Sequence, residues 1–487
     1  MHPIGYLPHE KPRTIPQLFF FAFQQLLVMM PATVTVALIT GFHTSTTILA
    51  SGMATIIALL VTKGKIPLYY GSSFSYLAVV VGITGVSYGE IASDETIRIA
   101  QFGILMSGFV SIAAGLIVKR AGMKVIKKIL PASITGPIAA IIGLSLASIA
   151  LTGAIGYDPV TSTASASSWW LAIAAILITT IFAVVLKKGV LSQLPILLGI
   201  GTTYIIAAIL GFVDFSPIVS GGVIAMPHIT FPKVHWGAAL AIMPIAFATI
   251  PESTAHLYQL DNAANSLVKE RKDKVEERRQ QITNKVLRLK DISNEEAQYI
   301  QATTSGDLSD TPTPSWLQKV EISSLLWLSL IADGIGDIVA ALIGGPGGTN
   351  YGENLSTMQI TRVYSKHVIF VAGLLAILCG FFAPLAGLFQ SIPGSVFNGV
   401  CIYLFGVIAW QGISIMHEDW KEVSSRRGIS VSSVVLTFGI GGSYAFNDGI
   451  PFMGWNVPAI AFAAIFGIIL NLVLLGFEKI GDRKNAD

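Results

Sequence analysis

The sequence predicts an all-α polytopic membrane protein, with about fourteen transmembrane segments arranged as a seven-plus-seven inverted repeat. Of its 487 residues, 53% are apolar and only 12% are charged, whereas an ordinary soluble domain has roughly 25% charged residues. Apolar stretches of about 20 residues, each long enough to cross a bilayer, recur from Gln17 to Gly476. So little charge excludes a cytosolic enzyme, a nucleic-acid binder and a disordered scaffold.

The individual segments are the apolar windows that lie between polar or glycine-rich breaks. In chain order they are expected at 17–40, 45–62, 66–85, 97–118, 131–152, 168–186, 192–213, 237–258, 321–343, 347–361, 366–388, 393–415, 428–446 and 456–477. The third, tenth and thirteenth segments are interrupted by Gly, Ser or Asn, and are therefore less regular than the others.

Lys and Arg fix the orientation of these segments, because basic residues concentrate in cytoplasmic loops. The loops after even-numbered segments hold Lys63, Lys65, Lys119, Arg120, Lys124, Lys127, Lys128, Lys187, Lys188, Arg362, Lys366, Lys421, Arg426 and Arg427. The opposite side holds only Arg98 and Lys233. We therefore expect a multi-pass protein of the cell membrane, with cytoplasmic tails at 1–16 and 478–487. The first tail resembles a retained tail and not a cleaved signal peptide, because the apolar segment behind it is too long.

A polar insertion at 259–320 separates the two halves. The run KERKDKVEERRQQITNKVLRLKD (269–291) alternates charges at helical spacing, which is typical of a solvated cytoplasmic helix or helix pair. Residues 303–314 have the Ser, Thr, Asp and Pro content of a linker. The insertion is either a loop without chemistry or a regulatory or partner-docking element.

Two glycine-rich breaks fall at matching places in the two halves. One lies in the third segment (65–76) and the other at the start of the tenth (344–354). Irregular backbone at membrane depth is tolerated only where protein buries it or where it lines a cavity. With seven segments in each half, the second half must be inverted, and such paired breaks indicate the substrate site of a transporter. Short half-helices after the breaks would point their N–H groups at the membrane midplane; the alternative is that these glycines only serve packing.

Few ionisable side chains fall inside the segments, and each is therefore a candidate functional residue. Glu252 and His256 share one face of the eighth segment, Glu353 follows the second break, and Asp333 and Asp337 share a face of the ninth segment. Burial disfavours the charged form of both a carboxylate and an imidazole, so such a pair suits proton handling. Carboxylates also accept paired N–H bonds from a planar, amide-like ligand. Glu252 and His256 could instead form an interfacial pair, and the two aspartates could serve only structural hydrogen bonds.

The remaining reactive residue types suggest no metal, cofactor or enzymatic site. The loop histidines are expected to be solvated, and both cysteines lie in apolar stretches that offer no disulfide or metal framework. The GGPGG run at 344–348 lacks the Lys and Ser/Thr of a phosphate-binding loop. These residues are His228, His235, His417, Cys379 and Cys401.

Three motifs resemble the nucleobase–ascorbate transporter family, and its bacterial uracil permease branch most closely. They are GKIPLYYGSSFSY (64–76), ESTAH (252–256) and TNYGENLSTMQITRVYS (349–365). In the tenth segment, Glu353, Asn354, Thr361 and Arg362 fit the family pattern, while Ser356 stands where Gly is usual. Gln24-Gln25 stands where a Gln-His pair is common in the first segment. These departures bear on which nucleobase is carried.

The resemblance implies a core domain and a gate domain, and a homodimer. The core would comprise 17–118, 237–258 and 321–388, and the gate would comprise 119–213 and 389–477.

The resemblance also implies roles for particular residues. Glu252 and Glu353 would bind the N–H groups of a pyrimidine, and His256 would assist proton coupling together with Glu252. Backbone N–H groups at Phe74, Ser75, Tyr76 and Gly352 would meet the carbonyl oxygens. Supporting positions are Asn354, Thr361, Asp333 and Gln25.

We therefore expect a proton-coupled importer of uracil or a close nucleobase, which works by movement of the core against the gate. A purine, xanthine or urate permease of the same fold is the alternative. An anion exchanger or channel on the same repeat is disfavoured by Glu252 and Glu353, and a membrane enzyme is the weakest option.

Overall fold

The computed structural model describes residues 5–86, 89–121, 128–145, 147–156, 165–186, 195–219, 222–283, 318–446, 449–452 and 455–484. Within these ranges the chain is mostly helical, and ten helices are long and apolar enough to cross a membrane. Two shorter apolar helices, Pro195–Ile209 and Lys366–Gly380, add to them. The prediction of a helical, multi-pass membrane protein is confirmed.

The first half of the chain contains eleven short or long elements in the described ranges. They are α1 (Ile15–Thr40), α2 (Thr44–Val61), β1 (Tyr70–Ser72), the 3-10 turn η1 (Phe74–Tyr76), α3 (Leu77–Thr84), α4 (Asp94–Ala121), α6 (Ala132–Ser145), α7 (Ala147–Ile155), α8 (Ala166–Val185), α9 (Pro195–Ile209) and α10 (Ser216–Val219).

The second half also consists mainly of helices, and it includes a short strand that is followed directly by a short helix. Its elements are α11 (Trp236–Ile242), η3 (Met243–Ile245), α12 (Ala246–Thr283), η6 (Ser323–Leu325), α14 (Leu326–Ile343), β2 (Gly348–Asn350), α15 (Gly352–Thr361), α16 (Lys366–Gly380), α17 (Ala383–Gln390), α18 (Gly394–Glu418), α19 (Trp420–Val423), α20 (Arg426–Leu436), the π-helical turn η7 (Thr437–Gly441), α21 (Gly442–Ala445), β3 (Gly449–Phe452), β4 (Trp455–Pro458) and α22 (Ala459–Lys484).

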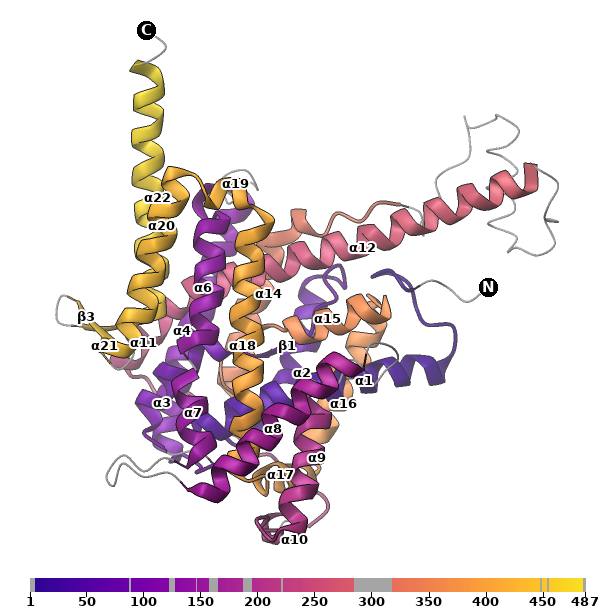
Figure 1. The fold of residues 1–487 in the computed structure, drawn as a ribbon, viewed down its shortest axis with the longest axis vertical. Helices are drawn as coiled ribbons and strands as arrows, with labels where there is room; N and C mark the ends of the chain where they lie inside the picture. The colour runs from indigo at the N-terminus through magenta and orange to yellow at the C-terminus, as the bar shows by residue number, and fades with distance from the viewer. Residues whose placement is uncertain are drawn as a thin grey trace.

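The long helices form two packing groups. In the first group α4 packs on α14, α2 packs on both α14 and α16, and α1 packs on α16. In the second group α18 packs on α6, α7 and α8, α8 packs on α9, and α20 packs on α6 and α22. In Figure 1 the helices α6, α18, α20 and α22 of the second group lie next to one another, and α12 extends away from the body as a long arm.

Strand β1 from the first half of the chain and strand β2 from the second half form an antiparallel pair, with Tyr70 opposite Asn350 and Ser72 opposite Gly348. This pair is called the strand crossing below. Each strand leads directly into a short helical element, β1 into η1 and α3, and β2 into α15. A Cβ on Gly71 would lie only 2.2 Å from the ring of Tyr351. A side chain at this position would therefore force the strands apart.

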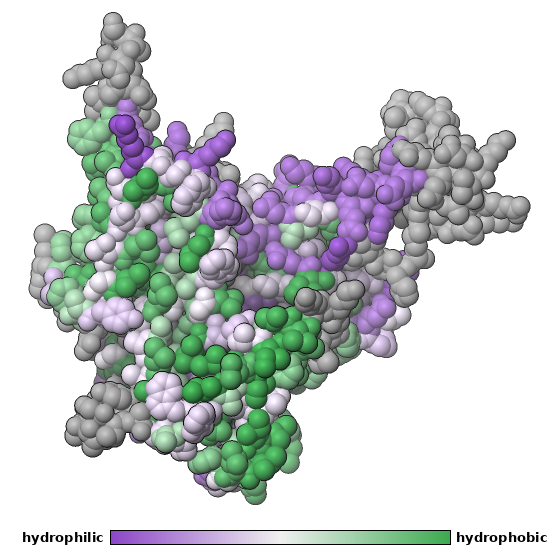
Figure 2. All heavy atoms as spheres, in the orientation of Figure 1, coloured by the Kyte–Doolittle hydropathy of each residue, from purple (hydrophilic) through white to green (hydrophobic). Residues whose placement is uncertain are grey.

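Helix α12 runs without interruption past residue 258, where the sequence predicted the eighth segment to end. Its outer part carries alternating charges, and Lys274 and Glu270 form an i, i+4 ion pair of 3.4 Å that supports a solvated helix. Hydrophilic residues gather along this arm in Figure 2, whereas the opposite part of the body is mainly hydrophobic. The expected helix at 269–291 is thus observed as far as Thr283, and 284–317 lie outside the described residues.

The N-terminal residues 5–10, called the strap below, connect the base of the α12 arm to the body. Arg271 on α12 donates two hydrogen bonds of 2.8 Å to the Glu10 carboxylate and a third of 2.8 Å to the Gly5 carbonyl. The Tyr6 N–H also donates to the Arg362 carbonyl at the end of α15, at 2.8 Å. Arm, strap and α15 are therefore connected by hydrogen bonds.

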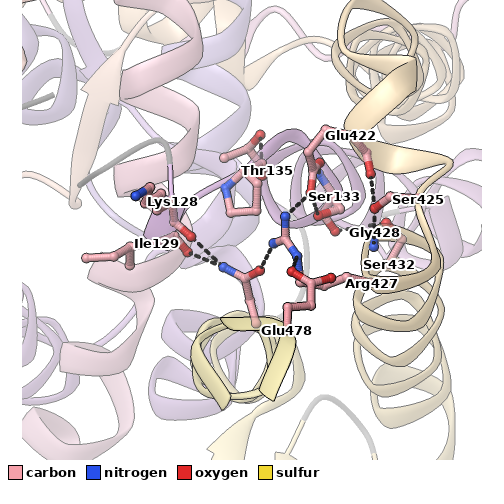
Figure 3. A network of polar contacts seen from close by, with 12 residues as sticks. Lys128, Ile129, Ser133, Thr135, Glu422, Ser425, Arg427, Gly428, Ser432 and Glu478 are labelled. Carbon is pink, nitrogen blue, oxygen red and sulfur yellow. Dashed lines mark hydrogen bonds and ion pairs between the residues drawn. The ribbon is translucent and has the colours of Figure 1, made fainter. Parts of the chain in front are cut away.

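A polar cluster joins α19 to three helices of the second packing group, α6, α20 and α22 (Figure 3). Glu422 on α19 accepts hydrogen bonds from the N–H and hydroxyl of Ser133, at 2.9 and 2.8 Å, and so caps the start of α6. Arg427 on α20 donates to Asn471 on α22 and pairs with Glu478 at 3.2 Å. Asn471 in turn donates to the Lys128 carbonyl at 2.6 Å. These contacts satisfy free helix-terminal groups and fix α6, α20 and α22 to one another.

Candidate functional site

A cavity of about 250 Å³ lies where β1 and β2 meet, between the two packing groups. Its walls are mostly apolar, and a few polar groups converge on it. The residues that contribute the polar and aromatic part of the wall are Ser72, Ser73, Phe74, Glu252, His256, Tyr351, Gly352, Glu353, Ser356, Thr357 and Tyr403.

Glu252 brings the first carboxylate to this cavity. It sits in α12 directly after Pro251, and the hydroxyls of Ser73 and Ser75 lie 3.4 and 3.5 Å from its Oε2 atom. These contacts link the Glu252 carboxylate to the turn that follows β1. Of the predicted residues, Glu252 and Ser75 are thus brought together.

Glu353 brings the second carboxylate from the other half of the chain. It lies in the first turn of α15, where the positive end of the helix dipole favours a negative charge. The preceding Gly352 also lines the cavity, and a Cβ at this position would lie 2.8 Å from His256 Nε2. The imidazole of His256 therefore packs directly on the α15 backbone, one residue before Glu353.

The predicted residues after β1 take different positions. The Phe74 ring lines the cavity and contacts Phe405 of α18 edge-on, with ring centroids 5.4 Å apart. The backbone N–H groups of Ser75 and Tyr76 already donate to Ser73, the first to its hydroxyl at 3.2 Å and the second to its carbonyl at 3.3 Å. The 3-10 turn thus satisfies two of the expected backbone donors internally.

Asp337 of α14 lies behind the cavity wall. Its carboxylate accepts hydrogen bonds from the Tyr70 hydroxyl at 2.6 Å, the Tyr76 hydroxyl at 3.1 Å and the Gly348 N–H at 2.7 Å. The Tyr76 hydroxyl also contacts Ser107 of α4 at 2.8 Å, so this side chain is directed away from the cavity. Asp337 therefore holds both crossing strands to α14.

Asp333, one turn earlier, holds the other end of β2. It accepts a hydrogen bond from the Ser253 hydroxyl, and the Asn350 amide donates to Ser253 at 3.0 Å and to Ser329 at 3.2 Å. Ser253 is the neighbour of Glu252, so this network fixes α12 against β2. The structural interpretation of the two aspartates agrees with these contacts.

The remaining predicted residues support α15. The Asn354 amide donates to the carbonyl and the side-chain oxygen of Gln25 in α1, at 2.8 and 2.7 Å. Thr361 donates to the Thr357 carbonyl of its own helix at 2.8 Å, and it does not line the cavity. Gln25 and Asn354 are thus brought together, whereas Thr361 only closes the last turn of α15.

Sequence reasoning missed three residues that shape the site. Ser73 contacts Glu252, Tyr351 lines the cavity, and Asn350 organises the network around Asp333. The Tyr351 hydroxyl donates to the Ser72 carbonyl at 3.0 Å and lies 3.0 Å from the Thr33 hydroxyl. The available signal was position, because Ser73, Asn350 and Tyr351 all lie within the two glycine-rich breaks.

Together these groups suit a small planar ligand that carries N–H donors. Two carboxylates offer strong acceptors, and the aromatic and aliphatic wall offers flat apolar contact. Such concave, mostly apolar cavities with a few convergent polar groups are typical ligand sites.

Comparison with known proteins places the whole chain among transporters. Residues 16–279 and 318–447 match a family model, Xan_ur_permease, described as the Permease family. The Bacillus caldolyticus uracil permease is 31% identical over 471 residues, covering 95% of this chain and 93% of that protein. The Escherichia coli (strain K12) uracil permease is 30% identical over 481 residues, covering 98% and 96%.

Solved structures share the fold at much lower sequence identity. The murine Slc26a9 anion transporter in its inward-facing state matches with a TM-score of 0.61 at 10% identity, over 96% of this chain and 70% of that one. The transmembrane domain of the cyanobacterial bicarbonate transporter BicA matches with a TM-score of 0.57 at 13% identity, over 95% and 98%.

Proposed function

The chain belongs to the permease family, and on this basis we propose that it is a secondary active transporter that imports uracil or a closely related nucleobase together with a proton. The observation that carries the proposal is the cavity at the strand crossing, into which each half of the chain contributes one glutamate. Two relatives that are named uracil permeases, 31% and 30% identical to this chain over nearly its whole length, support the choice of substrate.

Uracil is a planar ring with two N–H donors and two carbonyl acceptors. Glu252 and Glu353 would accept the N–H groups, and each charge-assisted bond contributes about 1.5–3 kcal/mol. The Gly352 N–H is the nearby donor for a carbonyl oxygen, whereas the hydroxyls of Ser73 and Ser75 donate to Glu252 and orient its carboxylate. Phe74 would lie against the ring as apolar wall.

The inverted repeat is supported by the symmetry of helix packing. When the segments of the two halves are exchanged, the α4–α14 contact becomes the α16–α2 contact, and both are present. Glycines occur at both contacts: a Cβ on Gly334 would lie 2.4 Å from the Gly108 carbonyl, and a Cβ on Gly52 would lie 2.6 Å from the Gly373 carbonyl. The antiparallel β1–β2 pair joins the two glycine-rich breaks that an inverted repeat would relate to each other.

The two packing groups support a core of 17–118, 237–258 and 321–388, and a gate of 119–213 and 389–477. The cavity lies between them, since α1, α12 and α15 face α9 and α18 across it. Movement of the core against the gate would expose the site alternately to each side of the membrane. The hydrophilic arm of α12 and the basic loops would face the cytoplasm, as would both termini, and a homodimer is expected from the family resemblance.

His256 is the residue we assign to proton coupling, because it lies one helical turn after Glu252 and its ring packs on Gly352, the neighbour of Glu353. In proteoliposomes with an acidic exterior, the wild-type chain should accumulate labelled uracil. A proton-motive force equivalent to 100 mV provides about 2.3 kcal/mol per charge, enough for roughly 50-fold accumulation. His256→Ala should lose most of this accumulation while it retains exchange of labelled for unlabelled uracil.

The matched control is His417→Ala, since His417 is an exposed histidine at the end of α18. It should accumulate uracil like the wild type. Equal loss of accumulation and exchange in His256→Ala would refute the coupling role. Uptake by the wild-type chain that does not depend on the pH gradient would refute proton symport itself.

A purine or xanthine permease remains the second candidate, because Gln24-Gln25 and Ser356 depart from the family pattern. An anion exchanger is disfavoured, since two carboxylates in one low-dielectric cavity would repel an anionic ligand.

A further inference from the structure

Three potential metal ligands meet far from the cavity. His43 precedes the first residue of α2, Asp94 is the first residue of α4, and His228 lies in the segment 222–235 between α10 and α11. The His228 Nε2 atom lies 2.9 and 3.1 Å from the two carboxylate oxygens of Asp94. The centroids of the His43 and His228 rings lie 4.4 Å apart. One potential ligand atom from each of the three residues lies within 4.8 Å of the ligand atoms of the other two.

This set matches the preferences of a zinc ion. Zinc takes imidazole nitrogens and carboxylate oxygens at 2.0–2.1 Å in a tetrahedron, so its ligand atoms lie about 3.3 Å apart. The His228 and Asp94 ligand atoms already have nearly this separation, and the His43 nitrogen, within 4.8 Å of both, would have to move closer to become the third ligand. We propose that His43, Asp94 and His228 form a Zn²⁺ site whose fourth position is taken by water.

The surroundings make the site accessible and preformed. The side chains of His228 and Asp94 are 48% and 57% exposed, so an ion can enter from solvent. The backbone beneath them is fixed, because the Thr46 hydroxyl donates to the His228 carbonyl at 2.8 Å. Two residues further on, the Gln101 amide donates to the Thr230 carbonyl at 2.8 Å. Binding would therefore require side-chain rotation and little movement of the backbone.

A bound ion would cross-link three separate elements. His43 directly precedes α2 and Asp94 begins α4, both in the first packing group, whereas the segment that carries His228 follows α9 and α10. Zinc would thus link the segment 222–235 to the first packing group and stabilise the folded chain.

The test is a zinc titration of the purified full-length chain, with its affinity tag removed and after treatment with EDTA. Calorimetry with zinc chloride should give one ion per chain. Because even residues that only support a zinc ligand are worth about 10–100-fold in affinity, His43→Ala, His228→Ala and Asp94→Asn should each weaken binding by at least about 10-fold. His228→Cys retains a zinc ligand and should bind better than His228→Ala, whereas His417→Ala should match the wild type.

Thermal unfolding gives an independent readout, since a ligand that binds only the folded state raises its stability. Zinc should raise the melting temperature of the wild type and leave that of His43→Ala/His228→Ala unchanged, while both proteins unfold alike without zinc. Magnesium chloride should have no effect on either, because imidazole ligands disfavour hard cations. Absence of zinc binding to the wild type, or equal binding to the double variant, would overturn the proposal.

Discussion

Replacing Glu353 with Gln should abolish measurable uptake of uracil at any pH. The substitution preserves the size of the side chain and its place in the first turn of α15. It removes the negative charge and turns one acceptor into an N–H donor that would face an N–H group of the ligand. Loss of one charge-assisted bond costs about 1.5–3 kcal/mol, which corresponds to roughly 10–150-fold weaker binding before the new clash is counted. Equilibrium binding and uptake of labelled uracil measure both effects.

The control for this variant is Glu277→Gln, because Glu277 is exposed on the α12 arm, more than one helical turn beyond the strap contacts. It should bind and transport uracil as the wild type does. Uptake by Glu353→Gln at the wild-type rate would sink the assignment of the cavity.

Replacing Asp337 with Ala should cause the largest loss of stability of any single change discussed for this chain. It leaves the Tyr70 hydroxyl and the Gly348 N–H without their acceptor in a buried setting, while the Tyr76 hydroxyl keeps only its contact with Ser107. Each unsatisfied buried group costs about 1–3 kcal/mol, so the strand crossing should loosen. Thermal unfolding in detergent should show a markedly lower midpoint than the wild type.

A companion variant separates the lost acceptor from the lost packing. Adding Tyr70→Phe to Asp337→Ala removes one orphaned donor and should recover part of the stability, since removing both partners costs less than removing one. An unchanged midpoint for Asp337→Ala would contradict the role assigned to this carboxylate.

Much of the fold could be predicted from the sequence, for physical reasons. Segments such as 97–118 and 393–415 stand out because uninterrupted apolar runs have few alternatives to a membrane helix. Glu252, His256 and Glu353 stood out because ionisable groups are costly at membrane depth. The extent of α12 was less accessible, because an apolar span and a charged arm look like two segments although one helix contains both.

The finer contacts of the site depend on residues far apart in the chain. Asp337 pairs with Tyr70 and Tyr76 from the other half, and no local pattern in either stretch specifies these partners. Tyr76 illustrates the consequence: the family resemblance implied that its backbone N–H meets the ligand, yet this N–H donates to the Ser73 carbonyl at 3.3 Å, and its hydroxyl contacts α4 and α14. Register between β1 and β2 likewise follows from close packing at Gly71 and Gly348, which becomes visible only in three dimensions.

The most direct test of the central claim is a binding titration of the purified chain with uracil and xanthine, each measured alone and in competition by calorimetry. We predict that uracil binds at one site per chain and that a large excess of xanthine does not displace it. The same titration with Glu353→Gln should show no heat from uracil. Tight binding of xanthine with weak or absent binding of uracil would contradict the proposed substrate, and binding of neither would contradict the nucleobase site.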